Sequence, residues 1–107
     1  MTSKLGRLGK ESGADGNTAT VTGANSSWTV NGTVRVGELA DGNSLAVENG
    51  GTVTLTGGNN LWVGYGIGSD ANVVSVSGSG SLLRLTGIGG EIIVSGSGGT
   101  DNRLVIA

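Results

Sequence analysis

The chain of 107 residues contains no cysteine, histidine, proline or phenylalanine. Without cysteine it has no disulfide scaffold, and without cysteine and histidine it lacks the usual zinc ligands, a thiol nucleophile and an imidazole base. Six basic residues against eight acidic ones leave a net charge of −2, so we expect no basic surface for nucleic acid. No apolar run approaches the roughly 20 residues of a membrane span, and MTSKLGRLGK lacks the apolar stretch of a signal peptide.

Glycine is the most informative residue that is present, with 23 copies. Valine, isoleucine, leucine and threonine fill the intervals between glycines and alternate with polar residues. Charged residues make up only 13% of the chain, too few for a charge-driven disordered segment. The pattern predicts many short strands joined by tight turns within a single domain over residues 1–107.

An internal repeat is marked by asparagines that recur after 26, 29 and 30 residues. An aspartate stands just before each asparagine, so that the turns read DGN, DGN, DAN and DN. We expect these polar side chains to stack at one corner as a hydrogen-bonded ladder. The residues of this expected ladder are Asp15, Asn17, Asp41, Asn43, Asp70, Asn72, Asp101 and Asn102.

Each repeat contains three segments in which apolar residues alternate with polar ones, and side chains two apart on a strand share a face. The expected inward pairs are Ala19/Val21, Leu45/Val47, Val74/Val76 and Leu104/Ile106 in the first segment, Trp28/Val30, Val53/Leu55 and Leu83/Leu85 in the second, and Val34/Val36, Leu61/Val63 and Ile92/Val94 in the third, which Leu8 joins. Glycines at the corners, such as Gly37, Gly64 and Gly96, supply the left-handed backbone of a sharp turn.

Three strands and three corners per repeat predict one coil of an all-β parallel β-helix, in which successive coils stack. We expect complete coils over residues 17–42, 43–71 and 72–101. Residues 5–16 form the tail of an earlier partial coil, and residues 102–107 start a later one. Since both ends leave strands unpaired, the chain is expected to form homo-oligomers through its end coils or through an apolar outer face.

The segment TVTGANSSWTVNGTVRVG (residues 20–37) resembles a repeat of bacterial autotransporter passenger domains, and residues 46–64 resemble its companion half. The matching positions are Val21, Gly23, Ser27, Trp28, Gly32, Val34, Val36 and Gly37. This resemblance implies a right-handed β-helix that is displayed at the cell surface or secreted, as an adhesin or stalk. It therefore favours a structural or adhesive module that presents its strand faces to a cell-surface partner.

Four side chains are candidates for ligand or partner contact. Trp62 is expected to point outward in a column with Arg35 and Ile93, with Tyr65 at the next corner. An exposed tryptophan beside a tyrosine and an arginine can stack on a sugar ring or anchor a protein partner. Trp28, in contrast, falls in an inward column and is expected to fill the core.

The acidic and hydroxyl side chains bear on three other functions. Four of the eight acidic residues are the turn aspartates and the others scatter, so we expect no catalytic pair, no metal site and no cofactor. The alternative is a carbohydrate-binding or carbohydrate-active β-helix that resembles a lyase or hydrolase. Calcium at the aspartate column is disfavoured, because each aspartate is expected to cap its own turn. An ice-binding threonine array over Thr52, Thr54 and Thr56 is a minor alternative, and Arg84 interrupts it.

Overall fold

The computed structural model describes residues 1–107, which form twelve strands and no helix. No helix is therefore available to cross a membrane. The strands are β1 (Thr2–Ser3), β2 (Gly6–Leu8), β3 (Thr18–Thr22), β4 (Ser27–Val30), β5 (Val34–Val36), β6 (Ser44–Glu48), β7 (Thr52–Leu55), β8 (Leu61–Val63), β9 (Val73–Ser77), β10 (Leu82–Leu85), β11 (Ile92–Val94) and β12 (Arg103–Ile106).

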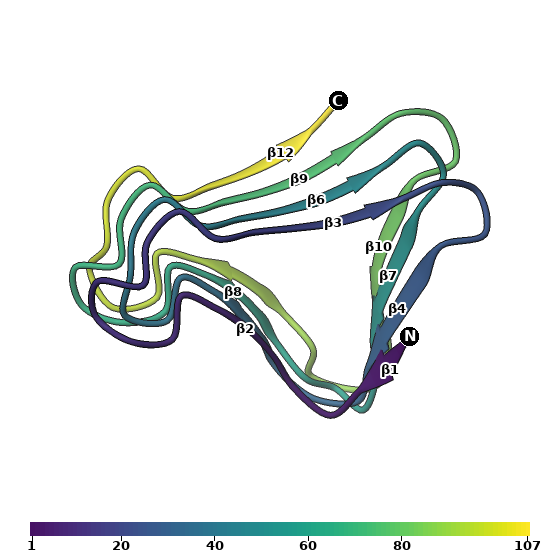
Figure 1. Ribbon diagram of the computed structural model, residues 1–107. Coiled ribbons are helices and arrows are strands. Elements are labelled where there is room, and N and C mark those ends of the chain that lie inside the picture. The colour runs from purple at the N-terminus through teal and green to yellow at the C-terminus, as the bar shows by residue number, and fades with distance from the viewer.

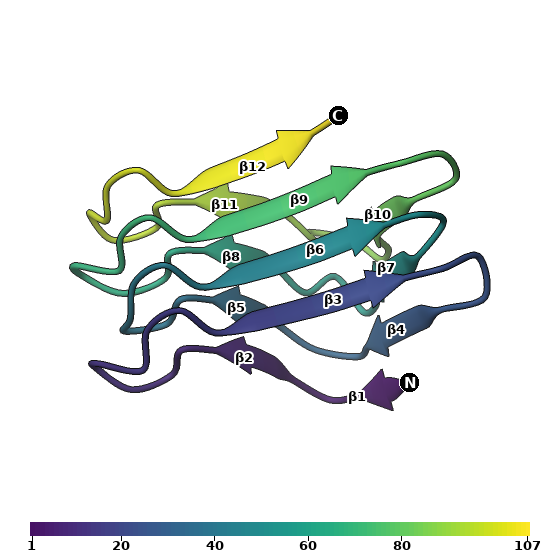
Figure 2. The same ribbon diagram turned by 45° about the horizontal axis from the view of Figure 1, so that its top comes forward.

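Every third strand pairs in parallel, and the pairing builds three four-stranded sheets around a triangular interior (Figure 1). Sheet A has the order β1-β4-β7-β10, sheet B the order β2-β5-β8-β11 and sheet C the order β3-β6-β9-β12. The chain is thus an all-β parallel β-solenoid with three strands per coil and about four turns, as the repeat predicts. Figure 2 shows the coils stacked in chain order, with the two termini at opposite ends.

The registers are those expected from the alternation of apolar residues. Val21 pairs with Val47 and Val47 with Val76 in sheet C, while Trp28 pairs with Val53 in sheet A. Their side chains meet inside the triangle, where Val47 and Val53 are fully buried. The apolar columns of the three sheets therefore form one continuous core along the stack.

The first coil starts earlier than the repeat indicates. Residues 2 and 3 form β1, which pairs with Thr29 and Val30 of β4, ahead of the expected start at residue 5. Trp28 closes the core at this end: its Nε1 donates to Ser3 Oγ at 2.9 Å, and its ring lies where a side chain on Gly6 would stand, since a Cβ there would be 2.7 Å from Cη2. Glycine at position 6 thus makes room for the indole.

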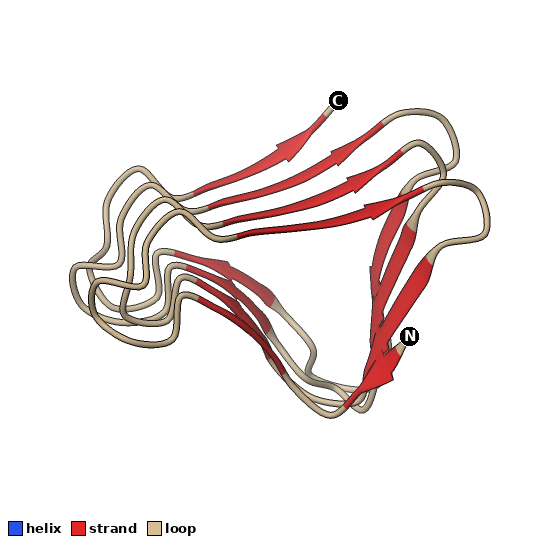
Figure 3. Ribbon diagram, in the orientation of Figure 1, coloured by secondary structure: helices blue, strands red, loops and turns tan.

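The longest connections lie at the corner between sheets B and C, on the left of Figure 3. The residue after each sheet B strand has a left-handed backbone, with φ of 68° at Gly9, 77° at Gly37, 77° at Gly64 and 60° at Ser95. In the last coil this position is Ser95, so the expectation of Gly96 there is wrong. Gly96 follows one residue later and has no positive φ.

Candidate functional site

The outer face of sheet B brings the candidate contact residues together. Arg35 of β5 pairs with Trp62 of β8, which pairs with Ile93 of β11, so the three side chains form one outward row. Tyr65 follows β8 at the corner. We refer to Arg35, Glu38, Trp62 and Tyr65 as the sheet B cluster.

The rings and the guanidinium of this cluster are in direct contact. The Arg35 Cζ atom lies 3.7 Å from the centre of the Tyr65 ring, which is the geometry of a cation–π contact. The Trp62 and Tyr65 rings meet edge to face, with centroids 4.8 Å apart and planes at 88°. Tyr65 is therefore held between a charge and a second aromatic ring, in a fixed orientation.

Trp62 is half-buried, more enclosed than the sequence suggests. Its ring leans over the next coil, where a Cβ on Gly96 would lie 2.4 Å from Cζ3. The absence of a side chain at position 96 lets the indole lie against the backbone. The cluster thus presents one side of the indole, while the other side packs against the solenoid.

Two charged residues of this face, Glu38 and Arg7, were missed by the sequence interpretation. Glu38 is 8% exposed and accepts a hydrogen bond from Arg35 Nη1, while Arg7 Nε lies 3.6 Å from its Oε2. Arg7 stacks directly on Arg35 in the sheet register, so the carboxylate stands between two guanidinium groups. The available signal was the shared column of Arg7 and Arg35 together with the three-residue spacing to Glu38.

The ion-pair network of Arg7, Arg35 and Glu38 leaves two buried polar atoms without hydrogen bonds. The Arg35 Nε atom and the Glu38 Oε2 atom are both buried and have no hydrogen-bond partner. One carboxylate shared between two arginines offsets half of their charge, so these three groups leave a single positive charge beside the aromatic rings.

The asparagines form a continuous ladder at the corner between sheets B and C. The backbone N–H and Nδ2 of each asparagine donate to Oδ1 of the asparagine one coil later, at 2.9 and 3.0 Å from Asn17 to Asn43, 2.8 and 3.2 Å from Asn43 to Asn72, and 2.9 and 3.0 Å from Asn72 to Asn102. Asn43 and Asn72 are fully buried. Since buried amide groups require hydrogen-bond partners, the ladder provides the partners that these asparagines need at the corner.

The aspartates form a second, shorter column with a different bonding pattern. Oδ1 of Asp15 accepts the N–H of Asp41 at 2.9 Å, and Oδ1 of Asp41 accepts the N–H of Asp70 at 2.8 Å. Each carboxylate therefore caps the turn of the next coil and not its own turn, contrary to expectation. No group of three His, Cys, Asp or Glu side chains is arranged to hold a metal ion.

Asp101 lies outside the aspartate column, and the expectation that it belongs there is wrong. Thr100 takes that place, because its N–H donates to Oδ1 of Asp70 at 2.8 Å. The asparagine ladder determines this register: counting two residues back from Asn102 leads to Thr100. Asp101 stands one residue later, in the column of Gly16, Gly42 and Ala71, with a left-handed φ of 58°.

Arg84 interrupts the threonine row of sheet A, as the sequence repeat predicts. Thr54 pairs with Thr29 on one side and with Arg84 on the other. Arg84 Nη2 donates to Thr54 Oγ1 at 3.4 Å, and Thr54 is only 8% exposed. The arginine covers part of the hydroxyl array that ice binding would require.

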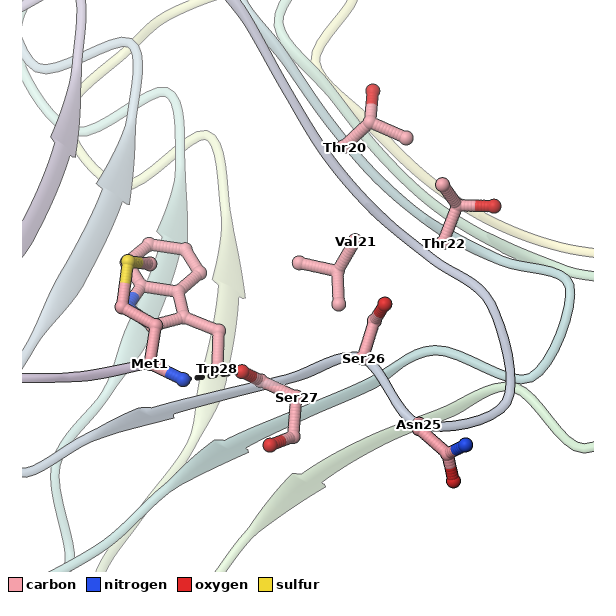
Figure 4. A pocket seen from close by; sticks show the side chains of 8 residues that line it. All are labelled: Met1, Thr20, Val21, Thr22, Asn25, Ser26, Ser27 and Trp28. Atoms are coloured by element: carbon pink, nitrogen blue, oxygen red, sulfur yellow. Dashed lines mark hydrogen bonds between the residues drawn. The ribbon is translucent and has the colours of Figure 1, made fainter.

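The solenoid has two hollows, and both lie at its N-terminal end. The larger one, about 510 Å³, is lined by Met1, Thr20, Val21, Thr22, Asn25, Ser26, Ser27 and Trp28. In Figure 4 the Val21 side chain points toward Met1 and Trp28, whereas Thr20 and Thr22 point away. The second hollow shares Met1, Val21 and Trp28 and extends to Leu8. They lie where β3, the first strand of sheet C, has no neighbour below it.

The fold and the asparagine ladder define this chain as a parallel β-solenoid protein. Comparison with protein-family models, with curated proteins and with solved structures finds no match. The likeness of residues 20–37 to autotransporter passenger repeats is therefore a resemblance in sequence, and the handedness and location that it implies stay predictions.

Proposed function

We propose that this chain is a non-catalytic adhesive module, a stacked scaffold that presents the outer face of sheet B to a partner surface. The observation that carries the proposal is the contact of Arg35, Tyr65 and Trp62 on that face. Aromatic rings and arginines are the side chains most enriched at sites that dominate binding energy. Parallel strand pairing holds Arg35 and Trp62, and contacts with both hold Tyr65, so little conformational entropy is lost on binding.

The resemblance to surface-displayed passenger domains supports a cell-surface partner of the module. The small net charge of the sheet B cluster favours a neutral polar surface over a strongly charged one. The pairing of Arg7 and Arg35 with one carboxylate leaves only a weak field to attract anions.

A neutral polysaccharide is a second candidate partner, and the aromatic pair favours it. The open side of the Trp62 indole, with Tyr65 set at its edge, offers an apolar surface on which a sugar ring can stack. In this case the chain binds the polysaccharide without cleaving it.

Single-molecule pull-off measurements test both candidates on surfaces coated with collagen, fibrinogen or chitin. We expect Trp62→Ala to lower the rupture force severalfold on at least one surface, because the main contact area is lost. Leu39→Ala is the matched control, since Leu39 is an exposed apolar residue outside the cluster. Equal forces for the wild type and Trp62→Ala on all three surfaces would refute the sheet B contact. Loss on chitin alone would favour the polysaccharide.

A further inference from the structure

The two ends of the solenoid expose complementary surfaces. At the C-terminal end the inward side chains of β11 and β12 are uncovered: Ile106 is 75% exposed, and Ile92 and Val94 are each 40% exposed. At the N-terminal end the two hollows beneath β3 share Met1, Val21 and Trp28 (Figure 4), and the smaller one is lined mostly by apolar residues. One end therefore has projecting apolar side chains, and the other has an apolar recess.

The incomplete coils at the two ends also complement each other. The first coil contains β1 of sheet A and β2 of sheet B, but no strand of sheet C precedes β3. The last coil contains only β12, a strand of sheet C. Placed end to end, these three strands make one complete coil.

We propose that the C-terminal end of one copy of this chain docks on the N-terminal end of a second copy. In this arrangement β12 pairs in parallel with β3 of the second copy, while β10 and β11 pair with its β1 and β2. Leu104 and Ile106 then continue the columns of Ala19 and Val21, because each column repeats from strand to strand of sheet C. Ile106 fills the hollow beside Trp28.

The two ends of the asparagine ladder are complementary, since one is an unmatched donor and the other an unmatched acceptor. The N–H of Asn102 has no acceptor, and Oδ1 of Asn17 has no donor. Every asparagine between them follows the same rule, with the earlier N–H bonded to the later Oδ1. In a head-to-tail stack Asn102 would face Asn17 of the next copy, and this rung would form only where the residue after β11 leaves room for the Asn17 side chain.

One residue opposes this joint. In the earlier coils a Cβ at Gly9, Gly37 or Gly64 would lie 2.2–2.3 Å from the asparagine of the following coil. Ser95 occupies the equivalent position after β11 and does carry a Cβ. Its hydroxyl Oγ accepts a hydrogen bond from Asn102 Nδ2 at 3.0 Å. Asn17 of the second copy must turn aside to avoid it. It is able to do so because Asn17 is exposed, unlike Asn43 and Asn72. The stack forms with this one ladder rung unmade.

The interface is heterologous, with different surfaces on the two partners, so assembly continues into open-ended stacks. It uses the ends of the solenoid and not the outer face of sheet B. It therefore goes beyond the adhesive role proposed above and is tested separately from it.

The first test replaces the opposing residue. Ser95→Gly frees the space for Asn17 and restores the ladder rung, so we expect a dissociation constant about tenfold lower, as for one added hydrogen bond. Sedimentation equilibrium over a wide concentration range measures it, with the wild type already showing a mass that rises with concentration. Ser97→Gly, an exposed serine outside the ladder, is the matched control. A Ser95→Gly variant that associates no more tightly than wild type overturns the in-register stack.

The second test blocks one end at a time. Ile106→Lys blocks the C-terminal end, and Ala19→Lys blocks the N-terminal end, where the hollow lets the lysine reach solvent. Each variant alone should be monomeric, and a mixture should form a one-to-one dimer that does not grow. Circular dichroism and tryptophan emission verify folding.

Two results would contradict the inference: wild-type protein that is monomeric at all concentrations, or a single-end variant that still dimerises by itself. Trp62→Ala should leave the association unchanged. Loss of adhesion without loss of stacking, or the reverse, therefore tells which of the two proposals fails.

Discussion

Gly37 shows how a single residue of this chain serves two requirements. Its φ of 77° lies in the left-handed region, and a Cβ there would be 2.2 Å from the Asn72 side chain of the next coil. Asparagine and aspartate can also adopt this left-handed backbone, as Asn49 and Asp101 do in this chain. The close approach of the ladder is what excludes every side chain.

Replacing Gly37 by alanine therefore costs more than replacing a glycine that has only the left-handed backbone. Gly68 is the matched control, since its φ is 73° and no atom lies within 4 Å of its hypothetical Cβ. We expect Gly68→Ala to lower the free energy of unfolding by about 1–2 kcal/mol. Gly37→Ala should cost about 1–3 kcal/mol more, from overpacking against the ladder. Urea denaturation measures the free energy of unfolding of both variants. Equal losses would show that the Asn72 side chain moves aside without cost.

The single residues of the sheet B cluster were only partly predictable. Arg35, Trp62 and Ile93 share a column because they stand at equal offsets in their repeats, which the sequence displays. The position of Glu38 between Arg7 and Arg35 depends on how the corner after β5 folds back. That geometry leaves no trace in the alternation of apolar residues.

At the scale of the strand, the period of two determines which side chains enter the core. In β6 the burial alternates along the strand, with Leu45 and Val47 fully buried and Ala46 on the outer face. Each strand is short, so its contribution comes from the columns above and below it. A strand that places one wrong side chain inward disturbs both neighbouring coils.

Val47→Asp and Ala46→Asp test this alternation at adjacent positions. Val47→Asp would bury an unpaired carboxylate between Val21 and Val76, at a cost of more than about 4 kcal/mol, so we expect an unfolded chain. Ala46→Asp places the same group on the outer face and should cost about 1 kcal/mol, the range of strand propensities. Circular dichroism and thermal melting compare the two, and a folded Val47→Asp variant would contradict the column register.

The whole molecule is stabilised by the stacking of coils that would not be stable individually. No coil encloses its own apolar face, and the core exists only because four coils align three columns of pairs. The asparagine and aspartate columns lock that alignment at one corner, where the connections are longest. Their amide and carboxylate oxygens accept backbone N–H groups of adjacent coils, so we expect the alignment to need no cation.

Metal removal is a test at this scale. Since Oδ1 of Asp15, Asp41 and Asp70 each accepts a backbone N–H, we expect millimolar EDTA to leave the melting temperature unchanged. Melting with added calcium is the matching control and should also show no shift. A fall of several degrees with EDTA, reversed by calcium, would show that the column binds a cation.

The sequence by itself determined the coil, its three strands, the inward columns and the asparagine ladder. Strand alternation and corner residues are local properties of the chain, and the same pattern recurs in every repeat. The tertiary structure decided the rest: Thr100 and not Asp101 in the aspartate column, Ser95 and not Gly96 at the left-handed corner, the half-burial of Trp62 and the pairing of Glu38. These depend on contacts between residues one coil apart, across corners whose lengths differ. Only the stacked coils bring such residues into register.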